Sequence, residues 1–196
     1  MRVASGGVDL LEAGTAQFER VVASIPPEAW HNPTPCEMTV REVVDHVVAG
    51  NIFATRLLAG ASTAEAVADL ENYTSGADPL GAVASTCASQ QSAFAAAAEA
   101  AAAGEVRALH HPIGDISLET FFRFRLGDLV VHAWDVAVGA GLDRSLDPAV
   151  VEGLWVIVEP HIDDMREMGA YGNSSGNLPA DASTQTRLLD AFGREG

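Results

Sequence analysis

The sequence is poor in cysteine. Only Cys36 and Cys87 occur among its 196 residues, which is too few for a disulfide scaffold, and they lack C-x-x-C spacing. We therefore expect both thiols to be reduced. Cys87 lies among small helical residues, which is typical of a packing role. Cys36 lies in a proline-rich loop before a helix, where the helix N-terminus favours a thiolate, so a reactive thiol is an alternative to simple packing.

Basic residues are also scarce. The chain has 11 Lys and Arg against 27 Asp and Glu, a net charge of −16. Binding to phosphate groups requires clustered positive charge, so this balance excludes nucleic acid and anionic membranes as expected partners.

Long apolar runs are absent, since none approaches the roughly 18 residues needed to span a bilayer. The opening residues MRVASGGVDL lack the apolar segment of a secretory signal. We expect a cytoplasmic protein.

Apolar residues recur at helical spacing through most of the chain. We expect one all-α domain over residues 1–196, built as a four-helix bundle with short additional helices and a C-terminal strap. The bundle helices are predicted at 8–25, 40–58, 80–103 and 117–139. The additional helices are predicted at 62–71, at 148–168 with a break near Pro160, and at 183–192 as the strap. Residues 105–114 look extended and are predicted to form a short hairpin or a crossing loop, with a turn at 114–115.

The second bundle helix carries a strong start signal. Thr39 followed three residues later by Glu42 forms a capping box, in which each side chain bonds a backbone N–H of the first turn. This role accounts for Glu42, although Glu42 and His46 also have a metal-ligand spacing of four residues. Projection of this helix places His46 on a face with Val43 and Phe53, so we expect it to point inward, either as a packed core residue or as a ligand.

Three other histidines give weaker signals. His110 and His111 are neighbours in the extended segment, and neighbours in a strand face opposite sides. We expect both to be exposed to solvent, and they are not predicted to bind one ion together. His161 follows Pro160 and is not predicted to be a ligand.

The fourth bundle helix contains the most informative spacing. Asp128 and His132 are four residues apart, so their side chains lie on one helical face about 5–6 Å apart at Cβ and can converge on one ion. Arg125 and Asp135 continue the same polar stripe. The stripe is either a solvated face of an amphipathic helix or part of a metal site that requires a third ligand.

Two motifs and the tail resemble a known family. Residues 34–48, TPCEMTVREVVDHVV, resemble the TPC-x-x-W-T-V-x-x-L-x-x-H motif of the DinB/YfiT-like superfamily, in its mycothiol-dependent maleylpyruvate isomerase N-terminal-domain branch. Residues 127–141, GDLVVHAWDVAVGAG, resemble that branch's D/E-x-x-x-H-x-W-D-L-A-x-A-x-G motif. The tail at 178–194, LPADASTQTRLLDAFGR, is similar to the end of uncharacterised stand-alone members. Met38 replaces the motif's tryptophan, and Asp128 stands where the isomerase has glutamate.

The resemblance implies a divalent metal held by His46, Asp128 and His132, with zinc expected and nickel or iron as alternatives. Three protein ligands leave a position for water or substrate, as in catalytic zinc sites. Such a site would activate a small thiol, such as mycothiol, toward a small electrophile, in a transfer or an isomerisation. Burying Asp128 with His132 would be costly without a counter-charge, which a metal would supply. Arg125 and Asp135 would then orient the ligands or line the rim.

Two alternatives remain open from the sequence. The chain could be a non-catalytic binding or stress-response module stabilised by a metal, or a bundle without metal in which the stripe is solvated. Helical bundles often pair through an apolar face, so a homodimer is also compatible with the sequence.

Overall fold

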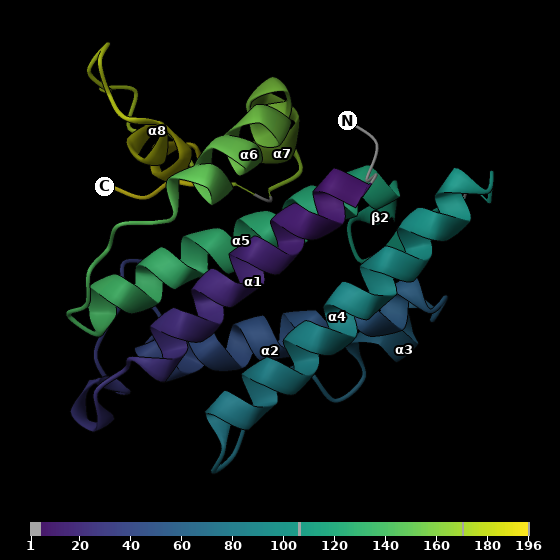
Figure 1. Cartoon of the computed structure of the whole chain (residues 1–196), viewed down its shortest axis with the longest axis horizontal. Helices are drawn as coiled ribbons and strands as arrows, with labels where there is room; N and C mark the ends of the chain where they lie inside the picture. The colour runs from purple at the N-terminus through teal and green to yellow at the C-terminus, as the bar shows by residue number, and fades with distance from the viewer. Residues whose placement is uncertain (1–4, 106, 170, 196) are drawn as a thin grey trace.

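The computed structural model describes residues 5–105, 107–169 and 171–195 and has the expected all-α, DinB-like fold (Figure 1). The bundle consists of α1 (Ser5–Ala23), α2 (Val40–Leu58), α4 (Pro79–Ala102) and α5 (Leu118–Gly139). These bounds lie within three residues of the predicted ones, because capping residues and apolar periodicity are local signals.

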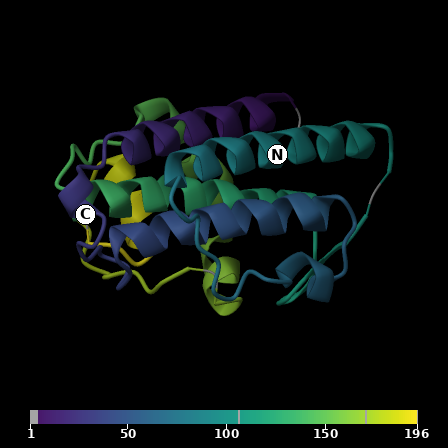
Figure 2. The ribbon, with the colours of Figure 1, turned by 90° about the horizontal axis from the view of Figure 1, so that it is seen from below.

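The four long helices run side by side along the length of the bundle (Figure 2). Both α1 and α2 pack against α4 and against α5. Consecutive helices α1 and α2 are therefore diagonal partners, and α4 is diagonal to α5. This order places α2 directly beside α5, so that side chains of the two helices meet along their interface.

Shorter elements cover the ends and one side of the bundle. They are η1 (Pro27–Ala29), α3 (Thr63–Val67), β1 (Leu109–His111), β2 (Gly114–Ile116), α6 (Pro148–Val158), η2 (Glu159–His161), α7 (Ile162–Glu167) and α8 (Thr184–Ala191). The predicted break at Pro160 is present as η2. In Figure 1, α6, α7 and α8 gather on one side of α5, and α8 packs against α6 as the predicted C-terminal strap.

The predicted hairpin forms, but its turn is displaced. Leu109 pairs with Ile116 and His111 pairs with Gly114, so the turn lies at residues 112–113. The expected turn at Gly114 and Asp115 is wrong, because proline at 112 fixes a backbone angle suited to the turn and Gly114 begins β2 with φ of +118°. Residue 106, at the start of the predicted extended segment, lies outside the described residues.

Capping contacts confirm the predicted starts of two bundle helices. Thr39 and Glu42 form both hydrogen bonds of the capping box at α2. Ser117 caps α5 by accepting a hydrogen bond from the Thr120 backbone N–H. These caps fix the register of the two helices that carry the candidate metal ligands.

Helix α5 is buried on nearly every side. It packs against α1, α2 and α6, and its polar stripe is covered as well: Arg125 and His132 are each 7% exposed and Asp135 is fully buried. The interpretation of the stripe as a solvated face is therefore wrong. A buried charged stripe must be paired to be stable, and the pairing defines the candidate site.

Helix α4 is rich in alanine and is held by few large side chains. Its buried residues, Val83, Cys87, Gln90 and Phe94, recur at helical spacing and form one stripe. Cys87 is fully buried, as expected for a packing role. Within the described residues, no helix combines the length and apolarity that a membrane crossing requires.

We predict that Phe94→Ala lowers the free energy of unfolding by about 3–5 kcal/mol, the usual loss for a buried aromatic ring. Phe94 is fully buried and its ring centroid lies 5.7 Å from that of Phe121 and 5.6 Å from that of Phe122. Urea denaturation measures the change. Leu80→Ala on the same helix, where the side chain is 47% exposed, is the control and should change stability by less than about 0.5 kcal/mol. Equal effects of the two substitutions would contradict the anchoring role.

Candidate metal centre

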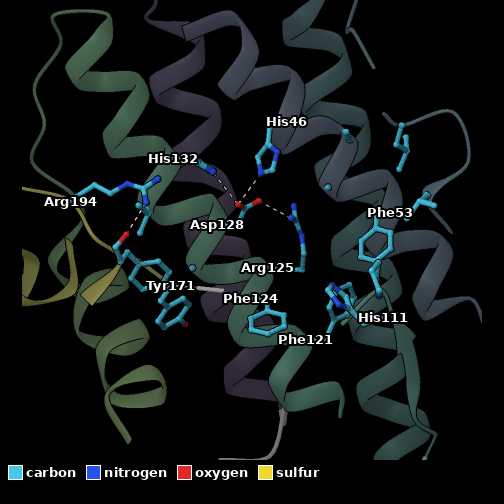
Figure 3. A pocket seen from close by; sticks show the side chains of 18 residues that line it. His46, Phe53, His111, Phe121, Phe124, Arg125, Asp128, His132, Tyr171 and Arg194 are labelled. Carbon is cyan, nitrogen blue, oxygen red and sulfur yellow. Dashed lines mark hydrogen bonds and ion pairs between the residues drawn. The ribbon is translucent and has the colours of Figure 1, made fainter. Parts of the chain in front are cut away.

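The structure brings together the three side chains predicted as metal ligands. His46 extends from α2, while Asp128 and His132 extend from successive turns of α5, and all converge at the Asp128 carboxylate (Figure 3). The Nε2 atoms of His46 and His132 lie 3.3 Å and 3.1 Å from Asp128 Oδ1. One donor atom of each residue lies within 4.8 Å of the others, close enough for all three to contact one ion.

The three side chains differ in exposure. The His132 side chain is 9% exposed, Asp128 is 19% exposed, and His46 is 48% exposed. The His46 side chain is therefore more exposed than predicted, although its Nε2 is directed at Asp128. Val43 and Val47 form the core face of α2, and His46 lies at the edge of that face, where it borders an open pocket. The donor group thus has a buried side and a side that a ligand can reach.

Arg125 supplies the counter-charge for this buried group. Its Nη1 donates to Asp128 Oδ2 at 2.7 Å, while its Nε and Nη2 donate to Gln90 and Asn51 at 2.8 Å and 2.9 Å. A metal was expected to supply the counter-charge of Asp128, and Arg125 already supplies part of that charge. Gly50 makes room for this side chain, since a methyl group at Gly50 would lie 2.8 Å from Arg125 Cζ.

Asn51 and Gln90 were not predicted as part of the site. Each is fully buried, on α2 and α4 respectively. In the sequence, each is a single amide side chain on an otherwise apolar or alanine-rich helix face, and this pattern does not show which residue the amide contacts. Both act by fixing the guanidinium that holds Asp128.

The pKa of Asp128 lies well below its usual value. Burial alone would raise it, but the positive charges of Arg125 and His132 and the hydrogen bonds from His132 and His46 outweigh burial. Asp128 is therefore a carboxylate at neutral pH, the form that binds metal.

His132 is oriented from its other side by Asp135. His132 Nδ1 lies 2.9 Å from Asp135 Oδ2, so Nε2 is directed at Asp128 and the pocket. Arg194 in turn donates to Asp135 from Nη2 at 2.8 Å and from Nε at 3.3 Å. A histidine whose second nitrogen is held by a carboxylate is the usual arrangement of metal-binding histidines.

The pKa of His132 lies well above its usual value. Burial alone would lower it, but the charge of Asp128 and the hydrogen bonds to Asp128 and Asp135 raise it by more than burial lowers it. Without a metal, His132 is therefore an imidazolium that donates from both nitrogens. A metal ion at Nε2 must displace that proton.

Arg194 comes from the tail after α8, a contact that the helix patterns did not predict. Two contacts seat the tail: the Phe192 ring lies where a side chain at Gly127 would be, and its centroid is 4.0 Å from that of Tyr171. The resemblance of the tail to other family members was the one signal in the sequence that pointed to this segment.

Cys36 lies beside the same histidine. Cys36, His132 and Asp135 form a second group whose donor atoms lie within 4.8 Å of one another. Burial raises the pKa of the half-buried Cys36 thiol, but hydrogen bonds with His132 and Thr34 bring it below its usual value. The lowered pKa favours the thiolate form, and the reactivity of the Cys36 thiol stays a prediction.

The candidate ligands open onto a pocket of about 520 Å³ (Figure 3). His111 lines it, half-buried against aromatic rings, so the prediction that His111 is solvent-exposed is wrong: strand β1 turns it toward α5. Burial and the nearby Arg125 charge lower the pKa of His111. His110 on the opposite face is exposed as predicted and lies 2.7 Å from Asp115. His161 is outside the site.

Comparison with known proteins agrees with the motifs. Residues 11–137 match the family described as mycothiol maleylpyruvate isomerase N-terminal domain. Two relatives from Mycobacterium tuberculosis, the uncharacterized proteins MT0763 (strain CDC 1551 / Oshkosh) and Rv0738 (strain ATCC 25618 / H37Rv), are each 30% identical over 134 residues. The alignment covers 67% of this chain and 65% of each relative, slightly less than two thirds of the relatives' length. No solved structure matches the chain significantly. With most of its bundle matched, the chain belongs to the mycothiol maleylpyruvate isomerase N-terminal domain family, a DinB-like family.

Proposed function

We propose that the protein binds one divalent metal ion through His46, Asp128 and His132 and uses it to activate a small thiol. The observation that carries the proposal is the convergence of three donor atoms within 4.8 Å at the edge of an open pocket. Two imidazoles and one carboxylate suit zinc, with nickel or iron as alternatives.

The second donor group is less suited to a metal. Asp135 is fully buried and already receives two hydrogen bonds from Arg194. A metal bound there would have to displace this ion pair. Cys36 is therefore better placed as a neighbour of His132 than as a ligand.

When bound, the metal would act as a Lewis acid that lowers the pKa of a coordinated thiol, so that a thiolate forms near neutral pH. The chain's own residues prepare the site. Arg125 keeps Asp128 ionised, and Asp135 with Arg194 directs His132 Nε2 toward the pocket. Phe53, Phe121 and Phe124 give part of the pocket an apolar lining beside the candidate ligands. Mycothiol is the thiol that the family suggests, and a small electrophile would be the second substrate, in a transfer or an isomerisation.

A specific observation favours one alternative, a non-catalytic binding or stress-response module. The Arg125–Asp128–His132–Asp135 network holds two positive and two negative charges without a metal. A bundle of this kind could bind a metal for stability alone. In that case metal would raise the melting temperature, while no thiol would be consumed with any electrophile tested.

We predict about one metal ion per chain in protein purified without chelators, measured by elemental analysis. His46→Ala and Asp128→Ala should each weaken zinc binding by more than about 100-fold, since even residues that only orient metal ligands contribute 10–100-fold. His110→Ala removes an exposed histidine outside the site and is the control. Metal-dependent consumption of mycothiol with a chromogenic electrophile tests the catalytic part. Wild-type affinity in both ligand variants would rule out this site.

We predict that zinc binding at pH 7 releases about one proton, because the pKa of His132 is raised and its Nε2 must lose a proton to bind metal. Zinc affinity should rise by about tenfold per pH unit below the pKa of His132 and level off above it. Calorimetry in buffers of different ionisation enthalpy measures the proton count. Binding with no proton release at pH 7 would show that His132 is not a ligand.

We predict that Arg194→Ala weakens zinc binding by about 10–100-fold, because Asp135 loses the partner that holds it against His132. Arg194→Lys should restore part of the affinity by returning the charge. Arg187→Ala is the matched control, because Arg187 lies in α8 and its side chain donates to the backbone carbonyls of Ala182 and Ala180. An unchanged zinc affinity in Arg194→Ala would leave Arg194 with a purely structural role.

A further inference from the structure

One side of the pocket is built from aromatic rings. Phe53 of α2, His111 of β1, and Phe121 and Phe124 of α5 form a cluster that we call the aromatic wall. The centroid of His111 lies 5.4 Å from Phe53, 5.9 Å from Phe121 and 5.8 Å from Phe124, and Phe53 meets Phe121 edge to face at 5.9 Å. These distances are those of attractive aromatic pairs.

The aromatic wall is not simply part of the core. Phe121 is 1% exposed and forms its base, whereas Phe53, His111 and Phe124 are only half-buried and line the pocket. Figure 3 shows the wall beyond Arg125, on the side of the pocket away from Arg194. Phe124 precedes Asp128 by about one helical turn, roughly 5.4 Å along α5, so a molecule on the wall would lie next to the candidate metal centre.

Among the described lining residues, each permanent cation is already paired with a carboxylate of the protein, Arg125 with Asp128 and Arg194 with Asp135. Among the described lining residues the permanent cations are Arg125 and Arg194, and every side-chain nitrogen of both already donates a hydrogen bond within the protein. The whole chain contains no lysine. Burial and the Arg125 charge lower the pKa of His111, which keeps the wall itself uncharged at neutral pH.

We propose that the aromatic wall binds a flat, uncharged aromatic group, and that the electrophilic substrate carries this group. The pocket volume of about 520 Å³ is within the range of about 300–1,000 Å³ that is usual for small-molecule sites. Rings that expose faces and edges favour another ring by offset or edge-to-face packing. In the metal-free protein, a carboxylate at the wall would be desolvated, and no described lining residue offers it a permanent cation that is not already paired, so small dicarboxylates are disfavoured as ligands of this side.

The assignment of the ring to a substrate rests on the proposed function, but the binding itself does not. Calorimetric titration of the full chain treated with chelator, with 2-naphthalenemethanol and with 2-naphthoate, tests the wall without the metal. The alcohol should bind at least about tenfold more tightly than the carboxylate, because the carboxylate loses hydration without gaining a partner. Equal or tighter binding of 2-naphthoate would overturn the proposal.

Variants locate the site. Phe53→Ala and Phe124→Ala should each weaken binding of 2-naphthalenemethanol by about tenfold, the upper range of a single aromatic contact. Ile113→Ala, on the exposed turn of the same hairpin and outside the pocket lining, is the matched control. Phe53→Leu keeps most of the apolar volume but removes the ring, so it separates loss of the aromatic contact from misfolding. It should weaken binding of 2-naphthalenemethanol while leaving the melting temperature near that of the wild type.

His111→Arg tests whether the lack of charge on the aromatic wall determines which ligand binds. An arginine at this position adds a cation to the wall, so 2-naphthoate should gain at least about tenfold relative to the alcohol. Wild-type binding of the alcohol in both Phe53→Ala and Phe124→Ala would place the ring elsewhere and overturn the proposal. Failure of the proposed function would instead appear as absent metal binding or absent thiol consumption, with these naphthalene titrations unaffected.

Discussion

The ion pair between Arg125 and Asp128 is the interaction on which the site depends. Charged groups buried in a bundle are stable only when each has a partner. Along α5 and the C-terminal tail the charges alternate in sign, from Arg125 through Asp128, His132 and Asp135 to Arg194. Each group is flanked by opposite charge, so the row can be buried while Asp128 and His132 still face the pocket.

Several residues outside α5 hold the Arg125 end of this row of charges in place. The missing side chain at Gly50 leaves space for the Arg125 guanidinium, and the amides of Asn51 and Gln90 bind its remaining nitrogens. Three of the four bundle helices thus contribute to holding one arginine. The same helix, α5, also carries Phe121 and Phe124, so the polar and aromatic sides of the pocket share one rigid support.

The fold was predictable from local signals, and the site only in part. Capping residues such as Thr39 and Ser117, and breakers such as Pro160, mark helix ends regardless of tertiary context. The spacing of Asp128 and His132 is likewise local, whereas adding His46 from another helix required the family resemblance. The polar partners could not be predicted, because a single Gln90 in an alanine-rich helix does not reveal what it faces. The burial of His111 and the partial exposure of His46 depend on how neighbouring elements cover them, which periodicity does not encode.

The position of Arg194 bears on how this protein can be divided. The segment that matches the family ends at residue 137, whereas the cation that neutralises Asp135 enters from beyond α8. A fragment trimmed to the family boundaries would retain every candidate ligand yet leave a fully buried carboxylate with only His132 beside it. Charge balance in the interior therefore ties the C-terminal tail to the segment that matches the family.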